Sequence, residues 1–591
     1  MIRIMTFVVI VSGLGVGSSA RADEAEDKAV AFAEKLGGKV TRDHSVAGKP
    51  VVTVSLSGSG VTDGELKQLL AINGLTVLNL SNTRVTDAGM NELAAFKNLT
   101  TLILDQKQIT NATLKALGEN KLLHLLSQAT TADGKRPSTE DDVASLSLFQ
   151  TQVTGEGMKG LTRLKNFQTL TMRDQQVTDA MLKALREHNM LHLLSQATAA
   201  GGKRPTKAED VTTLDLYETQ VTDAGLKELA SLTNLSTLSL PNNKLTNAGL
   251  KELAPLTNLS TLSLPNNKLT NAGLKELASL ANLTTIDVTV TNGSLKALRE
   301  ANLLHLLRQA KTGDGKRANK ADDVAHLNLS GTEVTDVGLK ELVPLLKLTT
   351  LNLDRTHVTD AGLKELAPLT KLTNLGLNSF KVSDVGLKHL APFTSLTTIR
   401  LHERHMTDRG LKEVASLKKL TTLNVYIING KAADAGLKAL RECGLLHVLS
   451  CATTADGRRP DKPEDVATLD LTWVRLTEAG IKELAPLKNL TSLTLDRDHI
   501  TDAVLKALRE ADLLHVLSYA YADYRRGVST RPAKVEEVTF MNLSGTRLTD
   551  AGVKELFPLK NITTLFLPSK GVTDAGVGEL QKALPKCKIS R

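Results

Sequence analysis

The sequence predicts an α/β repeat array, because a nine-residue cassette and a 24-residue step return along most of the chain. The cassette VTDGELKQL begins at Val61, returns as VTDAGMNEL at Val85 and as VTDAGLKEL at Val221, and occurs in eighteen versions in all. Repeat arrays bury their core between neighbouring units and need no domain breaks. The chain is therefore expected to form one elongated domain.

One complete unit, LTNLSTLSLPNNKLTNAGLKELAP at residues 232–255, contains both a strand pattern and a helix pattern. Leu238 and Leu240 alternate with Ser239, which is the period of a strand. Leu250 and Leu253 keep the spacing of one helix face. Each unit is therefore expected to place a short strand, a turn and a short helix around a core.

Units of this kind resemble the leucine-rich repeats of exported bacterial proteins, in which a 24-residue LxxLxLxxTxVTDAGLxxL pattern recurs. The resemblance covers the chain from about Val51 to its C-terminus. It implies a right-handed leucine-rich-repeat solenoid, or horseshoe, with a parallel β-sheet on the concave face and short helices on the convex face. It implies nothing specific about the ligand, because many functions are grafted on one fold.

The first 22 residues have the pattern of a secretory signal peptide, with Arg3, an apolar stretch, and small residues leading to Ala20-Arg21-Ala22. The mature chain is expected to begin at Asp23 and to be exported to the periplasm or secreted. The apolar stretch is too short to span a bilayer, and no later segment approaches the roughly 20 apolar residues of a transmembrane helix. No membrane span is therefore expected.

The remaining domain boundaries follow from the repeat. Residues 23–50 are expected to form an N-terminal cap, 51–577 the solenoid and 578–591 a C-terminal cap. The N-terminal cap contains a helix that stops at Gly37-Gly38, and LQKALPKCKI predicts a helix and a closing strand at the other end. The Thr-Asp pair that opens a cassette is expected to cap its helix, a role that Asn247 and Asn271 keep.

Five inserts interrupt the cassettes with segments that resemble LLHLLSQ, beginning near residues 122, 190, 303, 445 and 513. Leu126 follows Leu102 by 24 residues, so LLHLLSQ is expected to be a strand with Leu126 in the core. Replacing Leu126 with Ala should then cost roughly 2 to 5 kcal/mol. KRPSTEDDV replaces the helix, and Pro137, Pro205 and Pro460 suit the start of a single helical turn. With the inserts as degenerate coils, the solenoid has about 23 coils.

Composition excludes some function classes. Three cysteines in 591 residues cannot provide a disulfide framework, and Cys443 and Cys451 are expected to be free thiols. The formal charge of +9, or +7 without Arg3 and Arg21, favours solubility and does not indicate nucleic acid binding. Basic pairs such as Lys135-Arg136 recur in the inserts, but acidic pairs such as Asp141-Asp142 follow them and are expected to neutralise them.

Recurring histidines invite a metal hypothesis, which spacing argues against. One histidine occupies the same place in each insert: His124, His192, His305, His447 and His515. The closest two are expected to lie roughly 14 Å apart along the sheet, whereas Zn–N bonds are about 2 Å. The cluster His402-Glu403-Arg404-His405 has no third ligand at helical spacing and is interpreted as a solvated turn. No metal site, cofactor or catalytic group is expected.

The favoured function is a non-catalytic, monomeric binding scaffold whose concave surface takes a protein or polysaccharide partner outside the cytoplasm. The alternatives are a structural envelope component without a specific ligand and, with less support, a hydrolase that uses His402 or Glu403. Extraction would separate the structural component from the binding scaffold. A structural component should remain bound to the envelope on extraction and show no saturable soluble partner.

Large polar and aromatic residues at concave positions identify the candidate binding site. These positions are small or polar along most of the chain, but between Leu351 and Leu495 they and their neighbours become Asp354, Arg355, Arg400, His402, Tyr426 and Trp473. Trp, Tyr and Arg dominate binding hot spots, so Trp473→Ala and Arg400→Ala should each weaken binding by more than about 1 kcal/mol and leave stability nearly unchanged. The alternative is that Trp473 caps a strand end and Tyr426 fills an irregular coil at 406–432.

Overall fold

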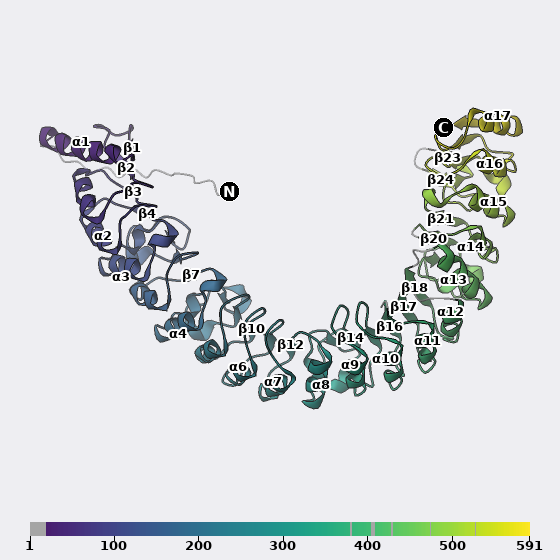
Figure 1. Cartoon of the computed structure of the whole chain (residues 1–591), viewed down its shortest axis with the longest axis horizontal. Helices are drawn as coiled ribbons and strands as arrows, with labels where there is room; N and C mark the ends of the chain where they lie inside the picture. Colours follow the sequence, from purple (N-terminus) through teal and green to yellow (C-terminus); the bar gives the residue numbers. More distant parts are fainter. Residues whose placement is uncertain (1–18, 379–380, 403–407, 427–429, 473, 526–527) are drawn as a thin grey trace. The chain divides into compact units, whose positions relative to one another are not determined.

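The structure is a computed structural model of the chain and describes residues 19–378, 381–402, 408–426, 430–472, 474–525 and 528–591. It forms two units. Unit 1 comprises Met1–Leu269 and Ser279–Leu283, and unit 2 comprises Thr270–Ala278 and Thr284–Arg591. Within each unit, short strands line one side and helices line the other (Figure 1).

Unit 1 begins with a long helix and continues with short strands and helices. Its helices are α1 (Ser19–Lys35), α2 (Asp87–Glu92), α3 (Asn111–Glu119), α4 (Asp179–Glu187), α5 (Asp223–Leu226) and α6 (Asn247–Lys251). Its strands are β1 (Lys39–Arg42), β2 (Val51–Ser55), β3 (Val77–Asn79), β4 (Thr101–Ile103), β5 (Ala129–Thr130), β6 (Ser145–Ser147), β7 (Thr169–Thr171), β8 (Ala197–Thr198), β9 (Thr213–Asp215), β10 (Thr237–Ser239) and β11 (Thr261–Ser263).

Unit 2 repeats this arrangement. Its helices are α7 (Asn271–Glu276), α8 (Asn292–Glu300), α9 (Asp336–Leu339), α10 (Asp360–Glu365), α11 (Asp384–Leu387), α12 (Asp408–Val414), α13 (Gly430–Glu442), α14 (Glu478–Lys482), α15 (Asp502–Glu510), α16 (Asp550–Val553) and α17 (Asp574–Ala583). Its strands are β12 (Thr285–Asp287), β13 (Ala310–Lys311), β14 (His326–Asn328), β15 (Thr350–Asn352), β16 (Asn374–Leu377), β17 (Thr398–His402), β18 (Thr422–Tyr426), β19 (Ala452–Thr453), β20 (Thr468–Leu471), β21 (Ser492–Leu495), β22 (Ala520–Tyr521), β23 (Asp523–Arg525), β24 (Val528–Thr530), β25 (Phe540–Asn542), β26 (Thr564–Phe566) and β27 (Lys588–Ser590).

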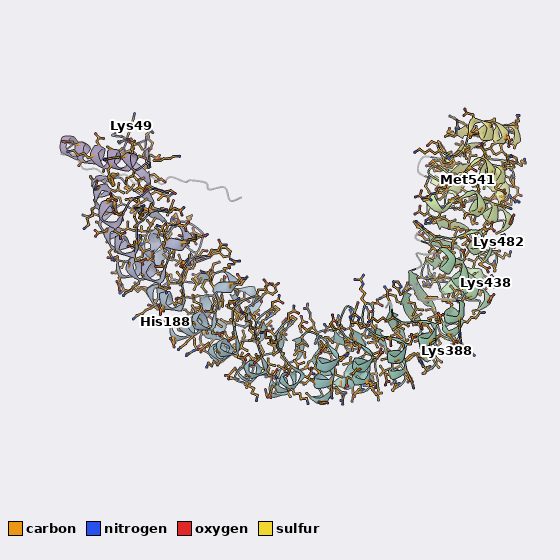
Figure 2. All side chains as sticks on the ribbon, in the orientation of Figure 1. Lys49, His188, Lys388, Lys438, Lys482 and Met541 are labelled. Atoms are coloured by element: carbon orange, nitrogen blue, oxygen red, sulfur yellow. The ribbon has the colours of Figure 1, made fainter. Side chains whose placement is uncertain are left out.

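Strands of successive cassettes pair in parallel at a step of 24 residues. Leu238 of β10 lies opposite Leu262 of β11, and both side chains are fully buried. In unit 2, β14 to β18 pair in parallel in sequence order. Lys388, Lys438 and Lys482 are exposed and lie on the helix side of unit 2 (Figure 2). The predicted α/β solenoid with a parallel sheet is thus confirmed.

Both ends of the repeat region carry the expected elements. Helix α1 ends at Lys35, and Gly37 takes a left-handed φ of 77° before β1 pairs antiparallel with β2. At the other end, α17 precedes β27, which pairs in parallel with β26. The domain boundaries after residues 22, 50 and 577 stay predictions. None of the helices that the structure describes is long and apolar enough to cross a bilayer.

The Thr-Asp pair of each cassette divides two roles between its residues. The Thr86 hydroxyl accepts the Ala88 N–H and so caps α2, as predicted. Asp63 instead reaches the next cassette, where the Thr86 N–H and hydroxyl donate to its two carboxylate oxygens, each at 2.6 Å. The same pair of bonds joins Asp336 to Thr359. We call this row of bonds the Asp–Thr ladder; it connects neighbouring helices.

The Asp–Thr ladder passes over the inserts. Asp179 of α4 accepts bonds from Thr222, although 43 residues separate the two and an insert lies between them. Arg186 at the end of α4 also donates to Glu228, Nε to Oε2, at 2.5 Å. An insert therefore adds no helix to the helix side, and the cassettes that flank it bond directly to each other.

The prediction that LLHLLSQ forms a strand is wrong for most of the segment. Leu123–Leu125 is one turn of 3-10 helix, and only Leu126 makes a parallel bridge, to Leu102. Leu126 is fully buried, as the 24-residue step predicts. Strand β5 then pairs antiparallel with β6, so the chain reverses inside the insert. The single turn in KRPSTEDDV begins at Glu140 and not at Pro137, because Thr139 is its cap residue.

In each insert, one arginine side chain donates hydrogen bonds to backbone carbonyl oxygens. Arg136 donates to the carbonyl oxygens of Leu126 at 2.7 Å and Ala129 at 2.8 Å, and its second terminal nitrogen faces three more. A guanidinium carries five donors, which suits this set of unpaired carbonyls. We call these residues the bridging arginines: Arg136, Arg204, Arg317, Arg459 and Arg531. In the fifth insert Arg531 has this role.

The other basic residue of a pair is neutralised by a neighbour that the sequence analysis did not identify. Lys135 lies 2.7 Å from Asp133, and Lys316 lies 2.9 Å from Asp314. Both lysines precede a bridging arginine, which faces inward to carbonyl groups. The basic pairs therefore present no continuous stripe of unpaired cations in these two inserts.

Candidate functional site

Five of the six predicted site residues lie on or directly after strands of unit 2. Asp354 and Arg355 follow β15, Arg400 and His402 lie on β17, and Tyr426 ends β18 opposite His402. His402 is half-buried. Trp473 lies outside the described residues, and for Tyr426 only the backbone position is described. The geometry of the site therefore rests on Asp354, Arg355 and Arg400.

Arg400 forms an ion pair with Asp354 across an intervening strand. Gly376 of β16 lies between Asn352 of β15 and Arg400 of β17 in the sheet register. The guanidinium passes this position to reach Asp354, whose carboxylate is bonded by Arg400 Nη1 and, at 2.8 Å, by the Asn378 N–H. A methyl group on Gly376 would lie 2.9 Å from Asp354 Oδ1. The glycine therefore leaves the room that this carboxylate needs.

Burial differs strongly between the two partners. The Asp354 side chain is 11% exposed, whereas the Arg400 side chain is 41% exposed. A buried carboxylate needs a charged or hydrogen-bonding partner, because its desolvation is costly. Asp354 therefore holds Arg400 in one position on the sheet and leaves part of the guanidinium accessible.

Arg355 is the exposed member of the site and has a strained backbone. Its φ is 56°, in the left-handed region, where the corresponding turns of other cassettes have residues such as Asn82, Asn242 and Asn266. Asn tolerates this conformation better than a long side chain without local hydrogen bonds. The Arg355 N–H donates to the Asn378 carbonyl at 2.9 Å, which fixes the turn against the next cassette.

A cluster of aromatic residues near the C-terminus was missed by the sequence analysis. The aromatic cluster comprises Tyr521, Tyr524, Phe540 and Phe566. Tyr524 stacks on Phe540 with ring centroids 4.1 Å apart, and Phe566 lies 5.8 Å from Phe540. Tyr524 is 55% exposed and Phe566 is 37% exposed. Tyr519, Tyr521 and Tyr524 provide three of the five tyrosines in the chain, which was the signal available.

The insert histidines are half-buried, and four of them, His124, His192, His305 and His447, lie near a bridging arginine. The Arg204 guanidinium contacts the carbonyl oxygen of His192 at 3.2 Å. Burial is the main cause that lowers the pKa of the His192 imidazole, and the neighbouring Arg204 charge lowers it further. The pKa of the other four insert histidines is lowered by burial as well. These imidazoles are therefore held in the neutral form near pH 7 by the fold.

Metal and thiol chemistry receive little support. Across the residues that the structure describes, no group of three or more His, Cys, Asp or Glu side chains could hold a metal ion. Glu403, Arg404 and His405 of the predicted turn lie outside that part of the chain. Cys443, Cys451 and Cys587 are all described and all unpaired, as predicted for the first two. Burial raises the pKa of the Cys451 thiol to about 11, so this group is a poor nucleophile near neutral pH.

Comparison with known families agrees with the repeat geometry. A family model described as Leucine Rich repeat matches residues 74–94, 324–343 and 345–367. The chain is a leucine-rich repeat protein. No curated protein matches this leucine-rich repeat protein.

Several solved structures are similar to this leucine-rich repeat protein. An internalin from Listeria monocytogenes is 21% identical, with 65% of this chain and 87% of that chain covered and a TM-score of 0.27. A leucine-rich repeat protein from Leptospira interrogans is 21% identical, with 76% and 96% covered and a TM-score of 0.29. A plant peptide hormone receptor, in complex with its peptide, is 13% identical, with 93% and 82% covered and a TM-score of 0.29.

Proposed function

We propose that this protein is an exported, non-catalytic binding scaffold that takes a protein or polysaccharide partner on the strand side of unit 2. The signal-peptide pattern of residues 1–22 supports export. The partner-binding residues of this proposal are the six at the predicted site: Asp354, Arg355, Arg400, His402, Tyr426 and Trp473.

The observation that carries the proposal is the fixed position of Arg400. Its guanidinium is held by the buried Asp354 carboxylate and is still 41% exposed. An arginine that is already held in place loses little side-chain entropy on binding, and arginine is enriched in binding hot spots. The exposed Arg355 lies next to it in the chain, in a backbone conformation that costs free energy. Strain at an exposed residue is typical of sites retained for binding.

Affinity capture tests the proposal. The mature chain is immobilised and exposed to periplasmic extract and culture medium, and the captured molecules are compared among the wild type, Arg355→Ser and Trp473→Ala. We expect the same protein or polysaccharide to be captured saturably by the wild type and at least about tenfold more weakly by each variant. Lys107→Ala, an exposed change in unit 1, is the control.

Equal capture by the wild type and both site variants would contradict the proposed binding site. Export is tested separately by mass spectrometry of the native protein, which should find Asp23 at the N-terminus and no intact Met1. A chain that stays bound to the envelope and captures nothing saturably would instead indicate the structural alternative.

A further inference from the structure

A second site lies beside the third insert and contains none of the six residues discussed above. A cavity of about 530 Å³ opens between β12 and β15, and its lining includes Asp287, Arg308, Gln309, Lys311, His326 and Asn352. This volume is within the range of about 300 to 1,000 Å³ that is usual for small-ligand sites. Polar side chains provide most of the lining, and the one apolar lining residue, Leu327, is part of the core.

The third insert differs from the first two in the residue that precedes its glutamine. In the first and second inserts a serine hydroxyl donates to the side-chain oxygen of the next residue, from Ser127 to Gln128 and from Ser195 to Gln196, each at 3.1 Å. The third insert has Arg308 in place of this serine. Gln309 Oε1 is consequently buried without a hydrogen-bond partner among the described residues. A buried acceptor without a donor costs free energy, which a ligand hydroxyl could recover.

Positive charge also gathers at this insert. Lys311 pairs with His326 across the β13–β14 ladder, where the first, second and fourth inserts pair Thr130 with Ser145, Thr198 with Thr213 and Thr453 with Thr468. Arg308 Nη1 lies 3.0 Å from Asp287 Oδ2, but its side chain is 70% exposed. Lys311 is exposed as well. The cavity therefore combines two accessible cations with one carboxylate.

We propose that this cavity binds a hydroxylated carboxylate, namely a uronic acid, either as the free sugar or as a residue of a polysaccharide. The ligand carboxylate pairs with Arg308 and Lys311, since an arginine can bond both oxygens of a carboxylate. A ring hydroxyl donates to Gln309 Oε1, and further hydroxyls bond Asp287 and Asn352 as donors or acceptors. A sugar fits better than an acidic peptide, because it presents several hydroxyls to the Gln309, Asp287 and Asn352 side chains in addition to its carboxylate.

Calorimetry on the full mature chain tests this assignment. The probes are D-glucuronate, a glucuronate-containing tetrasaccharide, D-glucose and an acidic glutamate peptide. We expect saturable binding of at least one uronate probe and no saturable binding of glucose or the peptide. Binding of the monosaccharide would identify free sugar as sufficient, and binding of the tetrasaccharide alone would identify the polymer; both support the proposal.

Two substitutions copy residues of the other inserts. Arg308→Ser places a hydroxyl beside Gln309, as Ser195 does beside Gln196 in the second insert. Lys311→Thr introduces the threonine that the second insert has as Thr198. Each should weaken uronate binding by roughly tenfold while the thermal midpoint stays unchanged. Lys203→Ala, an exposed change in the second insert, should leave binding unchanged. The proposal is overturned if neither uronate binds, if both insert variants bind as the wild type does, or if glucose or the peptide binds instead.

Discussion

Arg400 reaches across Gly376 to the buried carboxylate of Asp354, so one ion pair connects the cassettes of β15 and β17 across the intervening strand β16. This relationship changes what the predicted site should do when it is altered. Arg400 is partly exposed and suited to binding, but it also compensates a buried charge. A single substitution at Arg400 therefore affects both stability and partner binding.

Arg400→Ala is expected to lower the free energy of unfolding by about 2 kcal/mol. Among the described residues, the substitution leaves the buried Asp354 carboxylate with its bond from the Asn378 N–H alone, and loss of one partner of a buried pair is destabilising. The partial exposure of Arg400 keeps the cost below that of a fully buried pair. Urea unfolding measures it. Asp354→Asn in the same chain should recover part of the loss, and an unchanged midpoint for Arg400→Ala would contradict the structure.

Arg355→Asn is expected to stabilise the protein by about 0.5 kcal/mol, because Asn is favoured in the left-handed conformation that this turn requires. Binding of a strand-side partner should weaken at the same time. Thermal unfolding and affinity capture measure the two effects. Asn242→Arg, the reverse change in a turn of unit 1, should lower stability by a similar amount. A loss of stability in Arg355→Asn would show that Arg355 makes a contact that the turn needs.

Burial in this protein could be predicted from sequence because it is periodic. Leu126 lies in the core at the position that a step of 24 residues from Leu102 requires. The conformation around Leu126 could not be predicted, because a 3-10 turn and a strand both bury one leucine at this position. The corresponding reversal in the fifth insert, after Leu517, also hid the aromatic cluster. Tyr521 meets Phe540 through antiparallel pairing, which a parallel 24-residue step does not predict.

The Arg400–Asp354 pair shows the same limit for the site. Sequence analysis placed both residues on the concave face, but it treated each as an independent binding residue. Their contact depends on the absence of a side chain at Gly376, on a third strand. A contact between strands that are not neighbours follows from the register of all three. The 24-residue step predicts this register, but it does not predict that the Arg400 side chain extends along the sheet to Asp354.

Arg204→Lys is expected to cost about 3 kcal/mol of stability. Arg204 faces six backbone carbonyl oxygens, which lie within 3.3 Å of its two terminal nitrogens. The three donors of lysine are on a single nitrogen, which cannot reach the carbonyl groups bonded by Nη1 and those bonded by Nη2 together. Some of these carbonyl groups therefore lose their partner. Chemical denaturation gives the cost, and Lys203→Ala should give almost none. Equal stabilities for Arg204→Lys and the wild type would show that water replaces the guanidinium.

Gly362→Ala is expected to destabilise the protein by roughly 1 to 3 kcal/mol. A methyl group there would lie 2.3 Å from Asp336 Oδ1, the oxygen that accepts the Thr359 N–H in the Asp–Thr ladder. Gly578→Ala is the matched control, because a methyl group at that helical position meets nothing within 4 Å. It should raise stability by up to about 1 kcal/mol. Thermal unfolding of both variants measures the difference, and equal effects would argue against close packing along the ladder.

The insert histidines should make the protein less stable as the pH falls below about 6.5, the usual pKa of a histidine. Burial lowers the pKa of all five in the folded state. Between the unfolded and the folded pKa, the unfolded chain binds protons that the folded chain does not, so unfolding becomes easier with each step toward acid. The thermal midpoint is therefore expected to be flat above about pH 7.5 and to fall between pH 7 and pH 5. Replacing His192 and His515 with Gln should reduce this slope, because two of the five proton uptakes are removed. A midpoint that rises on acidification over the same range would show that these imidazoles gain a partner for their charged form in the folded protein.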